Sequence, residues 1–299
     1  MKTAAEQGNV LPAEVGAPSV RVERSIGTLL IHAGRLTLED AERILFQQRE
    51  HGQRFGDAAI QLGLLTKADI DFALARQFDY PYLIRGESKV SESLVAAYAP
   101  FGPQGQIFST LRSQLMLRWF DNDPIRKAMA IISAGRGEGR SYITANLAVS
   151  FSQLGQKTLL IDADMRNPVQ HQLFGIDNRN GLSAALAGRT DLQSVIQHVP
   201  GLLGLSVLAA GAQPPNPLEL LARPLFPQLL TELAHQFDII LLDTPSTAES
   251  ADAQTIAVRA GAALIIARKN ATRGWHVRGA SDTVAHASAS VIGTVLNDF

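Results

Sequence analysis

The sequence predicts an α/β domain with a doubly wound parallel sheet, preceded by a small all-α domain that contains a duplicated unit. Three observations lead to this prediction. After residue 128, short apolar runs alternate with helical patterns, a glycine-rich turn follows the first run, and two segments near the N-terminus repeat one another. The 299 residues are enough for about two domains of ordinary size.

Composition narrows the possible functions. The chain is 46% hydrophobic and 18% charged, so most of it can fold around a core, and its net charge of −1 argues against a nucleic-acid polymer as partner. The absence of cysteine excludes disulfides, thiol catalysis and cysteine-bound metals. No apolar run approaches the ~20 residues of a membrane span, and residues 1–23, which lack the pattern of a secretory signal, are expected to be a disordered tail. These features indicate a cytoplasmic protein.

The all-α domain, expected over residues 24–82, depends on the repeat. Residues 25–48 and 54–77 match at a constant offset of 29 positions. In each copy a short apolar helix is predicted to end at a left-handed glycine, and a threonine with an aspartate three positions later is predicted to cap a second helix. The matched pairs are Gly27 and Gly56, Gly34 and Gly63, Leu36 and Leu65, Thr37 and Thr66, Asp40 and Asp69, Leu45 and Leu74, and Gln48 and Gln77. Two such hairpins would pack into one small bundle.

The segment that follows the repeat, residues 83–106, is predicted to be a linker because it mixes proline, glycine and serine with short apolar pieces. The second domain is expected over residues 107–299. It is predicted to begin with a helix, since Phe108, Leu111 and Leu115 recur at helical spacing.

Six strands are predicted in the second domain. They lie at residues 128–133, 158–164, 205–210, 238–244, 262–269 and 291–298. Most lack polar alternation, as strands covered on both faces should, and helical patterns lie between them. This alternation predicts the parallel, doubly wound sheet.

The first strand runs into the stretch IISAGRGEGRSYITANLAV at residues 131–149. Gly135, Gly137 and Gly139 allow backbone N–H groups to turn toward an anion, and a helix that starts near Ser141 adds its N-terminal dipole. The stretch therefore predicts a phosphate-binding loop. The alternative is a glycine-rich turn that holds no ligand.

Two positions of this loop depart from the phosphate-loop pattern G-x-x-x-x-G-K-[ST], because Ala134 replaces the first glycine and Arg140 replaces the lysine. A guanidinium still neutralises phosphate, but it is wider and forked where an ammonium is compact. Ser141 keeps the hydroxyl that such loops use to bind Mg²⁺.

Three aspartates follow predicted strands. Asp162 and Asp164 end one strand and Asp243 ends another, so all three are expected at the carboxyl rim of the sheet, where ligands bind. A lone strand-end aspartate is often only a helix cap, but three of them beside a phosphate loop suit Mg²⁺ and water.

The tandem units at residues 25–77 resemble the N-terminal domain of type II secretion ATPases, in the form that binds cyclic di-GMP. The second copy keeps the leading arginine of that motif, Arg54, in the run RFG, whereas the first has Ser25 there and Arg24 one residue earlier. The resemblance implies a cyclic di-GMP site. Its candidate residues are Arg24, Gly27, Gly34, Gln48, Arg54, Gly56, Gly63 and Gln77.

The second domain resembles the bacterial tyrosine autokinases of exopolysaccharide synthesis, which belong with the MinD/ParA ATPases. The matching runs are SAGRGEGRS, LLIDADMRNP, GLSAALAG, GAQPPNPLELL and DIILLDTP. Together with the helical domain, the chain resembles the stand-alone chain-length-determinant kinase of exopolysaccharide synthesis. The resemblance implies ATP and Mg²⁺ as ligands, a membrane-anchored Wzz-like adaptor and a possible homo-oligomer as partners, and a cytoplasmic place beside the inner membrane.

The same resemblance assigns roles to residues. The ATP-binding set is Gly135, Gly137, Glu138, Gly139, Arg140, Ser141 and Tyr142. The Mg²⁺ set is Ser141, Asp162, Asp164 and Asp243, and the catalytic set is Arg140, Asp162 and Asp164. One of the two latter aspartates would accept the proton of the attacking hydroxyl.

Three departures from the kinase pattern bear on activity. The first is Arg140. The second is the C-terminal tail, where the resemblance implies a cluster of tyrosines that become phosphorylated. The four tyrosines of this chain, Tyr80, Tyr82, Tyr98 and Tyr142, all precede or border the loop instead. The third is the oligomerisation motif E-x-x-R-x-x-R, which appears as Gln106, Ser109 and Arg112.

These departures favour a nucleotide-binding regulator whose kinase activity is weak or lost. One alternative is a catalytically degenerate switch that docks on a membrane chain-length adaptor. Another is a MinD/ParA-type positioning ATPase, which would need a signature lysine at the position of Gly135.

Overall fold

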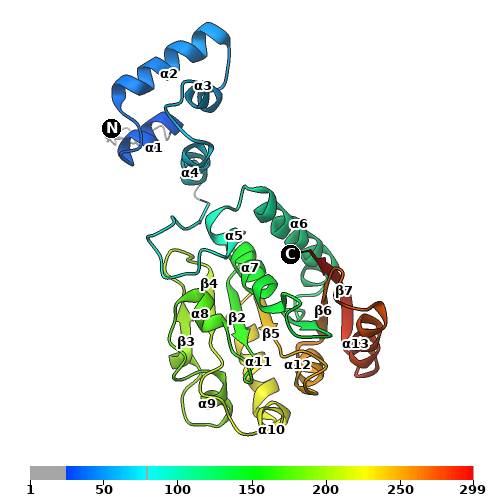
Figure 1. Ribbon diagram of the computed structural model, residues 1–299. Helices are drawn as coiled ribbons and strands as arrows, with labels where there is room; N and C mark the ends of the chain where they lie inside the picture. The colour runs from blue at the N-terminus through cyan, green and yellow to red at the C-terminus, as the bar shows by residue number, and fades with distance from the viewer. Residues whose placement is uncertain (1–24, 79, 299) are drawn as a thin grey trace, which may run out of the picture. The chain divides into compact units, whose positions relative to one another are not determined.

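The computed structural model describes residues 25–78 and 80–298, which fall into two compact units, Met1–Asp79 and Tyr80–Phe299 (Figure 1). The predicted tail at residues 1–23 and the candidate ligand residue Arg24 lie outside the described residues. None of the helices in the two described stretches has the length and apolar content needed to cross a bilayer.

The first unit contains two helical hairpins, one from each repeat. Its helices are α1 (Ile26–His32), α2 (Leu38–His51), α3 (Phe55–Gln61) and α4 (Lys67–Gln77). Gly34 and Gly63, which follow α1 and α3, have φ of 69° and 68°, the left-handed conformation that was predicted. The predicted threonine caps also form, since Thr37 Oγ1 accepts from Asp40 N–H at 3.1 Å and Thr66 with Asp69 makes a full capping box.

The core of the first unit is shared between the two repeats. α1 packs on α4 and α2 packs on α3, so each helix of one copy contacts a helix of the other. Two matched glycines also lie close to neighbouring helices: a Cβ on Gly27 would lie 3.3 Å from the Phe55 ring of the other copy, and one on Gly56 would lie 3.2 Å from Ile70 of its own copy. The repeat is therefore one folding unit with a joint core.

The second unit is built on a seven-stranded sheet in the order β3-β4-β2-β5-β1-β6-β7. The strands are β1 (Ala128–Ser133), β2 (Thr158–Asp162), β3 (Ile196–His198), β4 (Leu205–Leu208), β5 (Ile239–Asp243), β6 (Ala262–Arg268) and β7 (Ser290–Asn297). All neighbours are parallel except the β3–β4 pair, which is antiparallel. The α/β fold and all six predicted strands are confirmed. β3 was missed, because three residues that include Gln197 and His198 give no apolar run.

Helices cover both faces of this sheet (Figure 1). They are α5 (Val95–Tyr98), α6 (Pro103–Arg118), α7 (Arg140–Ser152), α8 (Gln170–Phe174), α9 (Leu182–Leu186), α10 (Pro217–Ala222), α11 (Leu225–Ala234), α12 (Asp252–Ala260) and α13 (Gly274–His286), with short 3-10 turns at Phe120–Asn122 and Gln193–Val195. α5 to α8 contribute to the core on one face, and α9 to α13 contribute to the core on the other. β1, β2, β4, β5 and β6 are almost fully buried, as their unbroken apolar runs require, whereas the edge strands β3 and β7 are partly exposed.

The segment predicted as a linker, residues 83–106, is instead part of the second unit. Leu83, Val90 and Leu94 are buried in the core beside α7. The amide N–H of Ala96 donates to Asn146 on α7 at 2.9 Å, so the backbone of this segment is also fixed. Its spaced apolar residues each find a place on the domain, and composition alone does not distinguish this from a free linker.

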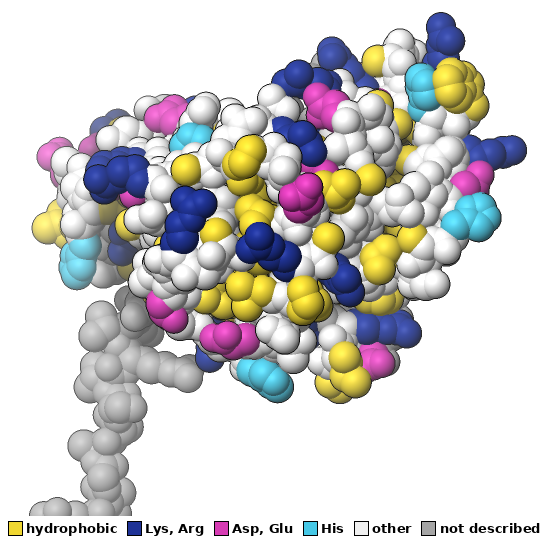
Figure 2. Space-filling model, turned by 90° about the horizontal axis from the view of Figure 1, so that it is seen from below, with side chains coloured by type: hydrophobic (Ala, Val, Ile, Leu, Met, Phe, Trp, Pro, Cys, Tyr) yellow, Lys and Arg dark blue, Asp and Glu magenta, His cyan; other side chains and the backbone are white. Residues whose placement is uncertain are grey.

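Charged side chains of both signs are interspersed with hydrophobic ones on the face that Figure 2 shows. This agrees with the net charge of −1.

Candidate functional site

The glycine-rich loop joins β1 to α7 at the carboxyl rim of the sheet. Gly137 and Gly139 have φ of 70° and 88°, so both take the left-handed conformation that glycine tolerates without strain. Gly139 is the N-cap of α7, and the helix points its first N–H groups into the loop. The strand–loop–helix arrangement predicted from the sequence is present.

Arg140 is the first residue of α7, and its guanidinium lies among the polar groups at the strand ends. Nη1 donates to Ser133 Oγ at 2.7 Å, Nη2 to Asp164 Oδ2 at 3.1 Å, and Nε to Asp243 Oδ1 at 3.3 Å. The arginine side chain is 11% exposed and those of Asp164 and Asp243 are 4% and 0% exposed. Arg140 is therefore a nearly buried cation shared by two carboxylates.

Asp162 and Asp243 lie opposite each other in the register of β2 and β5. Oδ2 of Asp162 accepts the backbone N–H groups of Val169 and Gln170 at 3.1 and 3.0 Å, whereas its Oδ1 is buried with no hydrogen-bond partner in the described structure. Asp243 accepts from the Gln170 amide at 2.8 Å through its other oxygen. The two carboxylates are thus fixed side by side by the turn that leads into α8.

Burial and mutual repulsion act on these carboxyls. Burial raises the pKa of Asp162 well above its ordinary value, and the charge of Asp243 raises it further. Burial also raises the pKa of Asp164, although the Asn167 N–H and Arg140 oppose that shift. Three ionised carboxylates at this place therefore need positive charge nearby.

The carboxylates as they stand do not fit a metal ion. Asp164 and Asp243 each bind the Arg140 guanidinium, and only Asp162 has a buried oxygen without a partner. Over residues 25–78 and 80–298, no group of three or more His, Cys, Asp or Glu side chains is arranged to hold a metal. The predicted carboxylates do lie together, but the Arg140 guanidinium lies between Asp164 and Asp243, where the sequence predicts Mg²⁺.

A pocket of about 620 Å³ opens beside the loop. Gly137, Gly139 and Tyr142 line it on one side, Phe108 and Leu111 of α6 form an apolar wall, and residues 295–298 at the end of β7 close it. Its shape is braced by the edge contact of the Phe108 and Tyr142 rings, whose centroids are 6.1 Å apart. Sequence reasoning assigned Gly137, Gly139 and Tyr142 to ATP but missed the walls that α6 and the end of β7 add to this pocket.

Hydrogen bonds to the other loop residues hold the glycine-rich loop in place. Glu138 is buried and accepts from the Thr272 hydroxyl at 2.5 Å, while its backbone carbonyl accepts from the Asn297 amide at 3.1 Å. The carbonyls of Gly135 and Ser141 accept from Ser133 Oγ at 2.9 Å and from the Gln170 amide at 3.0 Å. Glu138 thus ties the loop to β7 and to the turn before α13.

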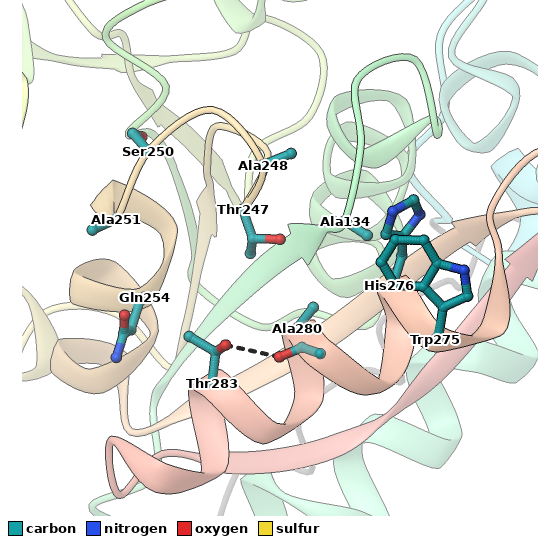
Figure 3. A pocket seen from close by; sticks show the side chains of 11 residues that line it. Ala134, Thr247, Ala248, Ser250, Ala251, Gln254, Trp275, His276, Ala280 and Thr283 are labelled. Atoms are coloured by element: carbon teal, nitrogen blue, oxygen red, sulfur yellow. Dashed lines mark hydrogen bonds between the residues drawn. The ribbon is translucent and has the colours of Figure 1, made fainter.

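A second hollow, of about 390 Å³, touches the start of the loop at Ala134 (Figure 3). Its wall comes from residues after β5 and from one side of α13, where Trp275 lies at the mouth and is 64% exposed. The segment after β5 is bound to the loop, since Thr247 N–H donates to Ser133 O at 2.9 Å and Ala248 N–H to Ala134 O at 3.1 Å. A change in the loop would therefore reach this hollow directly.

The candidate residues in the helical unit are dispersed over the repeat. Arg54 is exposed at the start of α3 and makes no ion pair with any described residue. Gln48 and Gln77 are half-buried, and the four glycines serve helix ends and helix packing. In the second unit, Arg112 of the eroded oligomerisation motif donates to Ser150 O at 2.8 Å within the fold.

Comparison with known proteins agrees with this geometry. The family model "Cellulose biosynthesis protein BcsQ" matches residues 126–296. The putative tyrosine-protein kinase CapB of Staphylococcus aureus is 37% identical over 192 residues, which are 64% of this chain and 82% of CapB. The tyrosine-protein kinase YwqD of Bacillus subtilis is 31% identical over 70% of this chain and 87% of its own length. The putative tyrosine-protein kinase EpsB of Ralstonia solanacearum is 34% identical over 70% of this chain, and the match spans 28% of that longer protein.

Solved structures give the same result. The kinase domain of the Escherichia coli tyrosine kinase ETK matches with a TM-score of 0.67 and 30% identity over 74% of this chain and 85% of that domain. The chimerical protein CapA2B2 matches with a TM-score of 0.65 and 32% identity over 75% and 96%. The septum site-determining protein MinD of Pyrococcus horikoshii, complexed with Mg-ADP, shares the fold with a TM-score of 0.51 and 24% identity over 57% and 70%. The chain therefore has the fold that MinD also has, and it belongs to the bacterial tyrosine-protein kinase family.

Proposed function

We propose that this protein binds ATP at the glycine-rich loop and acts as a nucleotide-dependent, kinase-like regulator of exopolysaccharide chain length or export. The observation that carries the proposal is the junction of the loop with the pocket beside it. Gly137 and Gly139 belong to both, so phosphates on the loop would place the rest of the nucleotide against the wall of Phe108 and Leu111. The tyrosine-kinase relatives support the role in polysaccharide synthesis.

The chain's own groups suit phosphate binding and poorly suit fast transfer. The loop N–H groups and the α7 N-terminus would hold the β- and γ-phosphates. Arg140 would have to contact those phosphates while it also forms ion pairs with Asp164 and Asp243. Since a displacement of about 1 Å can cost ~100-fold in rate, we expect weak phosphoryl transfer to tyrosine.

Turnover by wild-type protein beside Arg140→Lys tests this. We expect both to bind ATP and wild type to incorporate little γ-phosphate into itself or into a tyrosine-containing partner. Recovery of transfer in Arg140→Lys would identify the arginine as the cause. Efficient incorporation by wild type would refute weak catalysis while leaving ATP binding intact.

Filling the pocket beside the loop should weaken ATP binding. In Leu111→Trp a larger ring projects from α6 into the space proposed for the nucleoside, and we expect at least a tenfold rise in the Kd for ATP, about 1.4 kcal/mol. Leu117→Trp is the matched control, because Leu117 is on the same helix, is 71% exposed and does not line the pocket. Titration with a fluorescent ATP analogue measures both, and equal affinities would place the nucleoside elsewhere.

We further propose that the helical unit senses cyclic di-GMP. The duplicated motif supports this, together with the exposed guanidinium of Arg54, which pairs with no carboxylate among residues 25–78 and 80–298 and could stack on a guanine or bind a phosphate. The first copy offers Ser25 at the matching position, where its hydroxyl caps α1 instead. The ligand would therefore depend chiefly on Arg54.

Calorimetry with cyclic di-GMP tests the sensor. We expect binding by the full chain and at least a tenfold loss in Arg54→Ala, since a charge-assisted contact contributes about 1.5–3 kcal/mol. Arg43→Ala is the control, because Arg43 is an exposed arginine of α2 that pairs with Asp40. Absence of binding by the full chain would end the proposal for a cyclic di-GMP site.

The partner proposed for the second unit is a membrane-anchored, Wzz-like chain-length adaptor, with assembly into a homo-oligomer as a further possibility. With such an adaptor, the presence of ATP or ADP in the site would control docking even if no phosphate is transferred. This is the alternative of a catalytically degenerate switch. The positioning-ATPase alternative has less support, since its signature lysine would fall at Gly135. Co-purification with a candidate adaptor in the presence of ATP or ADP separates docking from catalysis.

A further inference from the structure

The nucleotide site has more fixed negative charge than fixed positive charge. Asp162, Asp164 and Asp243 meet at the rim, and among the described residues Arg140 is the cation paired with two of them. Other hydrogen bonds fix the two carboxylates that bind Arg140. Asp243 is also bound by the Gln170 amide at 2.8 Å, and Asp164 accepts the N–H groups of Arg166 and Asn167 at 3.2 and 2.9 Å. The carboxylates therefore cannot turn away from the guanidinium without breaking other bonds.

The guanidinium of Arg140 bonds three acceptors at once, which a lysine ammonium could not do in this geometry. Three different nitrogens of one guanidinium reach Ser133, Asp164 and Asp243. A lysine ammonium is a single point on a flexible stem and cannot span the same three acceptors in one plane. A guanidinium has five N–H donors, so with three engaged about two remain for a ligand, one on each terminal nitrogen.

We propose that Arg140 is the resident cation of this site and takes the part that a divalent metal ion plays in other P-loop ATPases, so that ATP binds here with little dependence on Mg²⁺. The inference rests on the proposed ATP binding. Arg140 would keep its bonds to Asp164 and Asp243 and offer its two remaining N–H donors to the phosphates. A metal ion would have to displace the guanidinium to reach those two carboxylates, since both cations need the same oxygens.

ATP affinity with and without metal tests the role of Arg140. For the full chain, the Kd of a fluorescent ATP analogue in EDTA is expected to stay within about threefold of its value with Mg²⁺. In Arg140→Lys the affinity in EDTA is expected to fall at least about tenfold below that with Mg²⁺, because the ammonium leaves one carboxylate uncompensated. Arg179→Lys is the control, since Arg179 lies outside the glycine-rich loop, is 87% exposed and pairs with Asp177, and it should behave as wild type.

A second measurement uses the metal alone and does not depend on ATP. Mn²⁺ binding, followed by electron paramagnetic resonance without nucleotide, should be absent at the wild-type site and should arise in Arg140→Met, where the carboxylates are released. Mn²⁺ bound by wild type but not by Asp243→Asn would overturn the proposal. So would a loss of ATP affinity in EDTA as large in wild type as in Arg140→Lys. No ATP binding with or without Mg²⁺ would instead remove the proposed function, and with it this role.

Discussion

Arg140→Met is expected to lower the free energy of unfolding of the second unit by about 3 kcal/mol, because it leaves two buried carboxylates without their cation. Methionine keeps most of the apolar stem, so the loss of packing is small and the loss of charge dominates. Asp164 and Asp243 are 4% and 0% exposed and have no room to recruit bulk water. Denaturant unfolding followed by a probe in the second unit measures the change.

The pH dependence of this loss provides a check. Arg140 lowers the pKa of Asp164 against the effect of burial, so without the guanidinium this carboxyl resists ionisation more strongly. The destabilisation should therefore be largest at pH 8 and shrink as Asp164 is protonated in acid. Arg136→Met is the matched control, since its side chain is 67% exposed and an exposed ion pair contributes less than about 1 kcal/mol. Equal losses in the two variants would mean that the buried network is not what Arg140 stabilises.

Asp162→Asn is expected to raise the free energy of unfolding at pH 8. The native state holds the proton of Asp162 more tightly than the unfolded chain does, because burial and Asp243 raise its pKa. Wild type therefore loses stability as the pH rises from the ordinary value of 3.8 through the raised one, and the variant escapes this loss. The amide oxygen can still accept the N–H groups of Val169 and Gln170.

The difference between wild type and Asp162→Asn isolates this one carboxyl. It should be near zero below pH 3.8, where the group is protonated in both states, and should grow toward neutral pH. Leu203→Asn, at an apolar position that is 94% exposed, is a control for the effect of a new amide on the surface. A variant less stable than wild type at pH 8 would contradict the assignment of Asp162 as a destabilising buried charge.

Most of the fold could be predicted because the inner strands of the sheet are apolar runs buried on both faces. β1 was predicted with its observed bounds, and β2, β4, β5, β6 and β7 differ only at their ends. The residues 83–106 could not be placed, since their burial depends on long-range contacts such as that of Ala96 with Asn146. Local composition contains no information about those contacts.

Those parts of the site that follow from the order of the strands could be predicted from the sequence. Those that depend on helix packing or on side-chain rotamers could not. The meeting of Asp162 and Asp243 follows from two parallel strands ending at one rim. The pocket wall of Phe108 and Leu111 does not, because nothing in the sequence brings α6 next to the end of β7. The contacts of Arg140 with Asp164 and Asp243 also depend on its rotamer, although the substitution itself was visible.

The cross-packing of the two repeats has a consequence for how the helical unit folds and for how it was able to evolve. In a solenoid each copy adds to a growing stack, so copies can be gained or lost one at a time. Here α1 contacts α4 and α2 contacts α3, so a single copy has no core of its own. The unit should unfold in one cooperative step, and a truncation that removes either copy should leave the other unfolded. The number of copies is therefore fixed by the joint core, whereas surface positions such as Ser25 and Arg54 can differ between them.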